Sequence, residues 1–208
     1  MNKVLITAML FTPLSAFAGN DHIESFSKAK KLLEKNVYFD HRETVYCNAR
    51  FDDKKFIMPP SGFQSDKSIK RAKKVEWEHV VPAENFGRVF VEWREGDESC
   101  VNSKGKTYKG RRCANKANKE YRLMQSDLNN LFPAIGSVNA MRSNYNFTML
   151  PDVSSDFGSC AMKIHDRKAE PPVSARGRIA RTYLYMEETY PRYNMSKQQR
   201  QLMTVWDK

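Results

Sequence analysis

The residues best suited to catalysis lie in one short segment, residues 75–82. In this segment His79 directly follows Glu78 and precedes two valines. A partly buried histidine beside a carboxylate is a candidate general base or metal ligand. The competing interpretation is a core histidine that is simply hydrogen-bonded to the glutamate. On a regular strand Glu78 and His79 would point to opposite faces, so a shared site requires the backbone to bend there.

Two asparagine-rich stretches, residues 126–131 and 136–144, supply a second kind of candidate. Asparagine oxygens and glutamate carboxylates are hard ligands, which suit Mg²⁺ or Ca²⁺ better than zinc. One carboxylate and one amide leave most of the coordination shell to water and substrate phosphate, which is how Mg²⁺ usually sits in phosphate chemistry. Asparagine is also common in caps and turns, so these stretches alone are weak evidence for a metal site.

The charge of the chain points to an anionic partner. The 208 residues include 35 Lys+Arg against 24 Asp+Glu, a net charge of +11, which favours nucleic acid, an acidic polysaccharide or an anionic membrane surface. Two basic clusters occupy residues 67–74 and 102–112, and lysines of this kind give sequence-independent, salt-sensitive contacts to phosphates. The alternative is a pair of solvated charged loops. The candidate phosphate-binding lysines are Lys73, Lys74, Lys104, Lys106 and Lys109.

The N-terminus reads as a secretory signal peptide. Lys3 precedes an apolar run of residues 4–11, and the stretch ends in Ser15-Ala16-Phe17-Ala18. Cleavage after Ala18 would leave a domain of residues 19–208. The apolar run is too short to span a bilayer, and no other stretch is longer, so we expect no membrane anchor.

Export makes disulfides the expected state of the four cysteines, because an oxidising compartment favours them. Cys47, Cys100, Cys113 and Cys160 allow three pairings, and the sequence alone does not choose among them. The preferred pairing is Cys100 with Cys113, which closes a basic loop, and Cys47 with Cys160, which joins distant segments. The alternative is a zinc site, but the sequence contains no close Cys-x-x-Cys pair.

The pattern of elements predicts a mixed α+β fold, a helix-rich single domain. The composition is that of an ordinary globular protein, with 40% hydrophobic and 28% charged residues. A strand is expected at residues 75–77, and few strands are expected in all, which argues against a barrel or a sandwich. Helices are expected at residues 21–36, 114–131, 133–143 with Pro133 at the start, 175–190, and after a capping box formed by Ser196 and Gln199.

Several motifs together resemble the bacterial endonuclease I family of periplasmic and secreted nucleases. The resemblance runs from about residue 22 to the end, and its blocks follow the family order, which makes it highly specific. The blocks are Glu76-Trp77-Glu78-His79-Val80-Val81-Pro82-Ala83, Met124-Gln125-Ser126-Asp127-Leu128-Asn129-Asn130-Leu131, Pro133-Ala134-Ile135-Gly136-Ser137-Val138-Asn139, Arg142-Ser143-Asn144, and Glu170-Pro171-Pro172 with Ala175-Arg176-Gly177 and Ile179-Ala180-Arg181-Thr182-Tyr183.

The resemblance implies a ββα-metal active site in which two strands and a helix surround one divalent ion. His79 resembles the general base that activates water. Glu78 and Asn139 resemble the Mg²⁺ ligands, with Asn130 as a second-choice ligand or supporting residue, and Mn²⁺ or Ca²⁺ as alternative ions. The arginine that neutralises the cleaved phosphate is left open between its two candidates, Arg111 and Arg112, because both precede Cys113.

The function implied by the resemblance is cleavage of DNA, and also RNA, with little sequence preference and with 5′-phosphate products. The expected protein is a monomer, periplasmic or secreted, with nucleic acid as its substrate and no membrane partner. Because family members continue past residue 208, the C-terminal end is expected to be short. The rival interpretation is a non-catalytic, basic nucleic-acid-binding protein of the periplasm, which would have no need of Glu78, His79 and Asn139.

Overall fold

The centre of the fold is a pair of antiparallel strands with a helix packed against them. The computed structural model describes residues 19–208, so the expected signal peptide at residues 1–18 lies outside the described part. Strand β3 (Val75–His79) pairs with β4 (Leu131–Ile135), and helix α7 (Gly136–Arg142) follows β4 without an intervening loop. Helix α7 contacts both strands, so the three elements form one unit.

Strand β3 ends at His79, which pairs with Leu131, the first residue of β4. Its register runs from Val75 opposite Ile135 to His79 opposite Leu131. The chain bends at Val80 and Val81, and the Val80 N–H donates to the carbonyl oxygen of Asn130 at 3.1 Å. The expected strand at residues 75–77 is thus confirmed and extends to His79, and a bend directly follows that residue.

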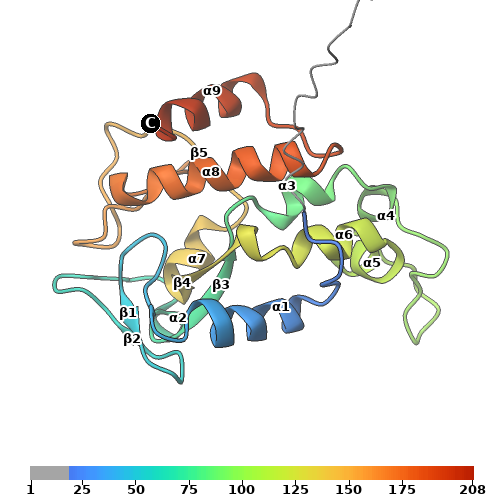
Figure 1. Ribbon diagram of the computed structural model, residues 1–208, viewed down its shortest axis with the longest axis horizontal. Helices are drawn as coiled ribbons and strands as arrows, with labels where there is room; N and C mark the ends of the chain where they lie inside the picture. The colour runs from blue at the N-terminus through green and yellow to red at the C-terminus, as the bar shows by residue number, and fades with distance from the viewer. Residues whose placement is uncertain (1–18) are drawn as a thin grey trace, which may run out of the picture.

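The remaining elements surround this unit (Figure 1). Helices α8 and α9 lie side by side along one edge, and helix α1 lies along the opposite edge. Short helices α3 to α6 gather at one end, and the β1–β2 ribbon lies at the other. The bounds are α1 Phe26–Leu32, its π-helical continuation η1 Leu33–Val37, β1 Arg50–Phe51, β2 Ile57–Met58, α2 Ile69–Ala72, α3 Ala83–Gly87, α4 Val91–Arg94, α5 Arg111–Ala117, α6 Lys119–Gln125, η2 Leu128–Asn130, β5 Asn146–Phe147, β6 Lys163–His165, β7 Lys168–Glu170, α8 Val173–Thr189 and α9 Lys197–Trp206.

The prediction of one continuous helix over residues 114–131 is wrong, because two short helices, α5 and α6, occupy most of this segment. Asn118 adopts an extended conformation, with φ −120° and ψ 118°, between α5 and α6. Its side-chain oxygen accepts a hydrogen bond from the Tyr121 N–H at 2.9 Å, which caps α6. The pattern of apolar residues therefore continues through a break that an asparagine cap creates.

The helix expected over residues 133–143 starts three residues late. Pro133 lies in β4, opposite Trp77, and helix α7 begins only at Gly136. The carbonyl oxygen of Pro133 accepts from the Val45 N–H at 2.8 Å. A two-stranded ribbon tolerates this proline because a missing N–H on its outer side removes no ladder bond.

The C-terminal half confirms the helices expected there. The expected stripe of α8 is buried, from Ala175 through Ile179, Tyr183 and Met186 to Tyr190. Helix α9 begins at the expected cap, since the Gln199 N–H donates to the Ser196 side chain at 3.1 Å. Its Trp206 is buried near Phe147, with ring centroids 6.4 Å apart, whereas Val205 faces solvent.

These elements make a helix-rich α+β domain, as expected. The three small sheets have the orders β1-β2, β3-β4 and β5-β7-β6. A large shared core joins α8, α9 and the β3–β4–α7 unit. Within residues 19–208, none of the helices combines the length and the apolar character needed to traverse a bilayer.

Candidate active site

Four of the predicted site residues meet at one cavity of about 360 Å³. Glu78 and His79 come from the end of β3, Asn139 comes from α7, and Arg111 is the first residue of α5. Glu78 and His79 both line this cavity, and the bend at Val80 and Val81 directly follows them. The other lining residues are Trp77, Pro82, Ala83, Glu84, Trp93, Ser143 and Asn144.

The imidazole of His79 is held in one tautomer. Its Nε2 lies 2.8 Å from the carbonyl oxygen of Gln125, and a carbonyl only accepts, so Nε2 carries the hydrogen. That assignment leaves Nδ1 with a free lone pair. The ring is mostly buried, with centroids 5.0 Å from Phe26 and 6.2 Å from Phe86. The histidine is therefore not bound to Glu78, and its unprotonated nitrogen is available to a ligand in the cavity.

The surroundings of His79 favour the neutral ring. Burial has the largest effect, and the positive charges of Arg111 and Arg142 act in the same direction, against the backbone hydrogen bond to Gln125. Together they lower the pKa of His79 from 6.5 to about 3. At pH 7 the ring is therefore neutral, with a free lone pair on Nδ1, which is the form that a general base has before it takes a proton from water.

Glu78 is a buried carboxylate with one bonded and one free oxygen. Its Oε1 accepts from the Tyr46 hydroxyl at 2.6 Å and from Nη1 of Arg142 at 2.8 Å. No side chain or N–H within residues 19–208 donates to its Oε2. Burial has the largest effect and raises the pKa of Glu78, although Arg142 and Tyr46 act in the opposite direction. One oxygen thus anchors the side chain and leaves the other for a ligand.

Arg142 ties the carboxylate to the strand end. The guanidinium is fully buried, and besides Glu78 its Nη1 donates to the carbonyl of His79 at 2.8 Å. Its Nη2 donates to the carbonyl of Val80 at 2.6 Å. One side chain from α7 therefore fixes both Glu78 and the bend that follows β3.

The amide of Asn139 is oriented in a similar way. Its Nδ2 donates to Oε2 of Glu76 at 2.9 Å, and a carboxylate only accepts, which fixes the orientation of the amide. Arg71 in turn binds Glu76, with Nε 2.7 Å from Oε1. Asn139 Oδ1 has no donor among the described residues, so it is free to bind a ligand.

The free oxygens of Glu78 and Asn139 are the donors that a hard divalent cation prefers. Both side chains line the same cavity. The described residues contain no group of three or more His, Cys, Asp or Glu that could enclose a metal ion. The donor set therefore suits a cation that takes two protein oxygens and fills its other positions with water and phosphate.

The structure separates the two arginines that the sequence left open. Arg111 lines the cavity, and its guanidinium carbon lies 5.6 Å from the centre of the Phe26 ring. Arg112 does not line the cavity, and its guanidinium lies 4.6 Å from the centre of the Tyr108 ring. Of these two arginines, Arg111 is the one placed to meet an anion beside His79.

Asn130 is not among the residues that line the cavity. It is fully buried; its side-chain oxygen accepts from the Val81 N–H at 2.7 Å and its amide donates to the Val81 carbonyl at 3.0 Å. Both ends of the amide are engaged by one residue. This placement makes Asn130 a support for the bend after β3 and leaves it no free oxygen facing the cavity.

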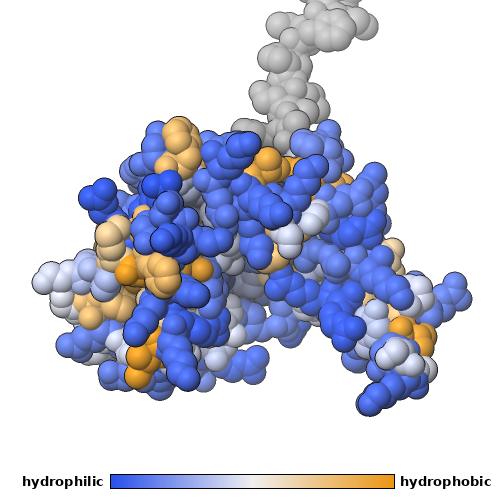
Figure 2. All heavy atoms as spheres, turned by 90° about the horizontal axis from the view of Figure 1, so that it is seen from below, coloured by the Kyte–Doolittle hydropathy of each residue, from blue (hydrophilic) through white to orange (hydrophobic). Residues whose placement is uncertain are grey.

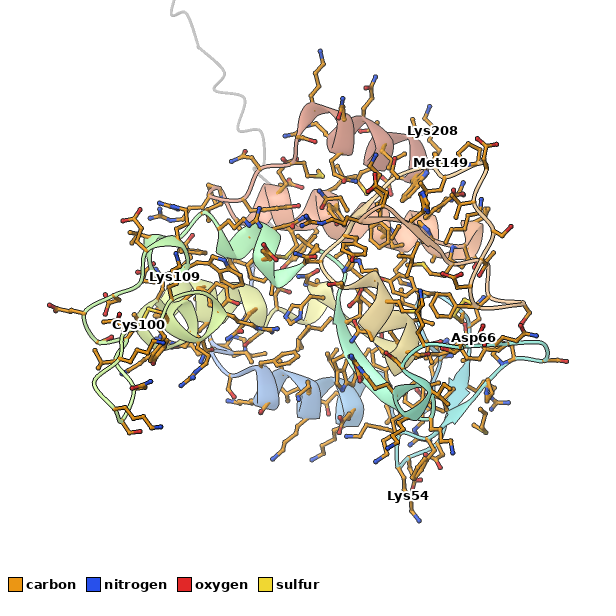
Figure 3. All side chains as sticks on the ribbon, turned by 180° about the vertical axis from the view of Figure 1, so that it is seen from behind. Lys54, Asp66, Cys100, Lys109, Met149 and Lys208 are labelled. Atoms are coloured by element: carbon orange, nitrogen blue, oxygen red, sulfur yellow. A yellow bond between two sulfur atoms is a disulfide. The ribbon has the colours of Figure 1, made fainter. Side chains whose placement is uncertain are left out.

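The five predicted lysines are exposed and lie outside the cavity. Lys104, Lys106 and Lys109 lie on the loop between Cys100 and Cys113, which projects from one end of the molecule (Figure 3). Lys73 and Lys74 lie between α2 and β3. Figure 2 shows the molecule hollowed between its main body and the arm that carries the projecting loop.

Both preferred disulfides are confirmed. Cys47 is bonded to Cys160 and Cys100 to Cys113, and no free cysteine is found in the described chain. The first bridge joins residues 113 positions apart, immediately after the Tyr46 that binds Glu78. The second closes the basic loop immediately beyond Arg111 and Arg112. Such bridges are typical of proteins that fold in an oxidising compartment.

The residues that orient the site were not predicted from the sequence. Glu76 lies two positions before Glu78, and that spacing places both on one face of the strand. Arg142 lies three positions after Asn139, a spacing that places both on one side of a helix. These spacings were available as signals. Tyr46 and Gln125 gave none, because each reaches the site from a distant segment.

Comparison with known proteins places the chain among nucleases. The family model described as Endonuclease I matches residues 24–207. An extracellular deoxyribonuclease of Aeromonas hydrophila is 37% identical over 217 residues, which cover all of this chain and 86% of that protein. A periplasmic deoxyribonuclease of the same species is 37% identical over 212 residues, covering 98% of this chain and 80% of that protein.

A more distant relative agrees. Endonuclease-1 of Buchnera aphidicola subsp. Acyrthosiphon pisum is 35% identical over 193 residues, covering 89% of this chain and 70% of that protein. The family match spans nearly the whole described chain and includes every residue of the cavity. The chain therefore belongs to the Endonuclease I family and is a nuclease.

Proposed function

We propose that this protein is an exported, Mg²⁺-dependent endonuclease that hydrolyses phosphodiester bonds of DNA and RNA without sequence preference. The observation that supports this proposal most strongly is the meeting of an unprotonated imidazole nitrogen, two free hard oxygens and an arginine at one cavity. In this proposal β3, β4 and α7 are the ββα-metal motif. One chain supplies the whole cavity, so a monomer suffices.

In the proposed reaction Nδ1 of His79 removes a proton from a water molecule. The hydroxide forms a bond to phosphorus as the bond to the 3′-oxygen on the opposite side breaks. The 3′-oxygen takes a proton from solvent, so the products are a 5′-phosphate and a 3′-hydroxyl. Arg111 neutralises charge on the phosphate, and Arg142 keeps Glu78 in place. Mg²⁺, Mn²⁺ or Ca²⁺ held by Glu78 and Asn139 would supply Lewis-acid stabilisation of the phosphate and the leaving oxygen.

The location that fits this chemistry is the periplasm or the medium. Two disulfides and the predicted signal peptide both indicate an exported chain. Relatives called extracellular and periplasmic deoxyribonucleases support the same two locations.

The test is plasmid nicking by the oxidised mature protein, with Mg²⁺ and with EDTA. His79→Ala should lower the Mg²⁺-dependent rate by about 10²- to 10⁴-fold, the usual contribution of a general base. The matched control is His165→Ala, because His165 is exposed on β6 and lies outside the cavity. A folded wild type that shifts DNA on a gel but does not cut it would favour the non-catalytic binding protein instead.

A further inference from the structure

A second cavity of about 490 Å³ adjoins the catalytic one. It lies between α1 and β3, and it shares Trp77 and Asn139 with the catalytic cavity. A ligand that reaches the free oxygen of Asn139 therefore stands at the junction of the two. We call this second cavity the α1 groove and define it by Phe26, Lys30, Lys31, Lys55, Trp77 and Asn139.

The uncompensated charge in the α1 groove is positive. Two carboxylates line it, but Glu76 is paired with Arg71, and Glu34 is paired with Lys55 at 2.9 Å. The two remaining cations are Lys30 and Lys31 in the last turn of α1.

No carboxylate of residues 19–208 lies within ion-pairing distance of Lys30 or Lys31. Both ammonium groups are thus available to an anion in the groove.

The groove also offers aromatic surface. The ammonium of Lys30 lies 4.7 Å from the centre of the Phe26 ring, and Phe26 itself packs against His79. Trp77 donates its indole N–H to Glu34 at 3.2 Å, which fixes the ring at the junction with the catalytic cavity. Lysines beside aromatic rings are the combination by which proteins hold single strands of nucleic acid without reading their sequence.

We infer that the α1 groove binds the substrate strand on one side of the bond that is cut. Lys30 and Lys31 bind phosphates of that strand, and Phe26 and Trp77 contact its sugars or bases. The inference rests on the proposed nuclease function and adds a binding subsite to it. In this inference the nucleic acid next to the cut bond contacts helix α1. Lys104, Lys106 and Lys109 line neither cavity.

The first experiment measures binding without cutting. The wild type and a Lys30→Ala/Lys31→Ala variant are titrated in EDTA against a short fluorescent single-stranded oligonucleotide at several salt concentrations. Removing two phosphate contacts should reduce the slope of log affinity against log salt by about 1.4 and weaken binding about tenfold or more at low salt. The control is Lys28→Ala/Lys35→Ala, which removes the same charge from exposed positions of α1 and η1 outside both cavities.

The second experiment locates the contact. The bond that is cut most often in the short oligonucleotide is first mapped with Mg²⁺, and single phosphates on either side of that bond are then replaced in turn by neutral methylphosphonates. On one side, replacements should weaken binding of the wild type and of the control pair but leave the Lys30→Ala/Lys31→Ala variant unchanged. The inference is overturned if the control pair loses as much affinity as the test pair, or if every replacement weakens all three proteins equally.

The outcomes separate this inference from the proposed function. A protein that shows the expected binding pattern but does not cut with Mg²⁺ retains the α1 subsite and loses the hydrolytic proposal. A Lys30→Ala/Lys31→Ala variant with unchanged affinity and unchanged KM for cutting overturns the subsite alone. A wild type that cuts plasmid with Mg²⁺ but does not bind the oligonucleotide overturns the subsite and retains the hydrolytic proposal. Thermal unfolding of each variant checks that the fold is intact.

Discussion

His79 shows how a single residue combines burial with a fixed tautomer. The Gln125 carbonyl holds its Nε2, and the surrounding apolar rings together with Arg111 exclude a second proton. This arrangement makes the unfolding free energy depend on pH. A histidine that is protonated in the unfolded chain but neutral in the folded one stabilises the fold above its unfolded pKa, and this contribution is lost as the pH falls.

This shift predicts a difference between wild type and His79→Ala in EDTA. From pH 7 to pH 5 the unfolding free energy of the wild type should fall by about 2 kcal/mol more, because the unfolded chain binds a proton with a pKa near 6.5 and the folded chain does not until about pH 3. Urea titrations at the two pH values measure it. Equal losses in both proteins would mean that His79 is not the buried neutral group.

Glu76 acts on the site through another residue. It contacts the amide of Asn139 on one side and Arg71 on the other. Without it the amide of Asn139 could rotate, and its oxygen would no longer be directed at the position of a ligand. Groups that orient a ligand of this kind usually contribute about 10- to 100-fold to metal affinity.

We therefore expect Glu76→Ala to raise the Mg²⁺ or Mn²⁺ concentration required for half-maximal binding by about 10- to 100-fold. Glu76→Gln keeps an acceptor for the Asn139 amide and should restore most of the affinity. Direct titration with Mn²⁺ measures binding apart from cutting. If the alanine variant binds the metal as the wild type does, the orienting role is excluded.

At this scale the sequence predicted the residues that meet at the cavity better than the residues that support them. Glu78 and His79 stand out because they are adjacent polar residues in an apolar segment. Asn139 was singled out by a resemblance to known nucleases, since asparagines are frequent in turns. Arg142 and Glu78 are 64 positions apart, and no local pattern marks a contact at that distance.

The start of α7 is the element on which the site depends most. Gly136 joins β4 to α7 without a loop. A Cβ there would lie 2.5 Å from the Arg71 carbonyl oxygen and 3.0 Å from Glu76 Oε1. Helix α7 carries both Asn139 and Arg142, so any shift of its first turn displaces two groups of the site together.

The expected outcome of Gly136→Ala is a loss of about 1–3 kcal/mol in unfolding free energy, because the backbone of α2 has to move. Metal affinity should fall with it, as Asn139 is displaced. The adjacent Ser137→Ala is the matched control, since the Ser137 hydroxyl is buried without a partner and its removal adds no atom. Chemical denaturation and Mn²⁺ titration of the Gly136→Ala and Ser137→Ala variants measure both effects. Equal stability of the two variants would show that α7 accommodates a methyl group at Gly136.

The sequence predicts helices that carry a long apolar stripe, but it does not predict most of the short helices and strands. Helix α8 follows its stripe because its partners lie along its whole length. Around Asn118 and Pro133 the local pattern is helical, but a side-chain cap and a strand partner 56 positions away decide the conformation. Pairing between distant segments outweighs a local preference when the pair is buried.

The two disulfides constrain the whole molecule unequally. The Cys47–Cys160 bridge spans 113 positions and Cys100–Cys113 spans 13. In the chain-entropy model a longer loop removes more freedom from the unfolded chain, with about 4–5 kcal/mol expected for the long loop and about 3 kcal/mol for the short one. The long bridge also holds the segment that brings Tyr46 to Glu78.

Cys47→Ser/Cys160→Ser should therefore lose more unfolding free energy than Cys100→Ser/Cys113→Ser, by about 1–2 kcal/mol. The first variant should also bind Mn²⁺ more weakly at a temperature where both are folded. The second should leave metal binding unchanged. Thermal unfolding and Mn²⁺ titration of the two variants test both statements, and a reversed order of stability would contradict the first.

The position of the long bridge has a consequence for the cell that makes this protein. Tyr46 donates a hydrogen bond to Glu78, the proposed metal ligand, and its neighbour Cys47 is covalently fixed only once it is oxidised. A newly made chain in a reducing cytoplasm lacks that lock. We therefore expect the proposed catalytic centre to be less well assembled before export, while the chain shares a compartment with the chromosome, and to be completed when the bridge forms after export.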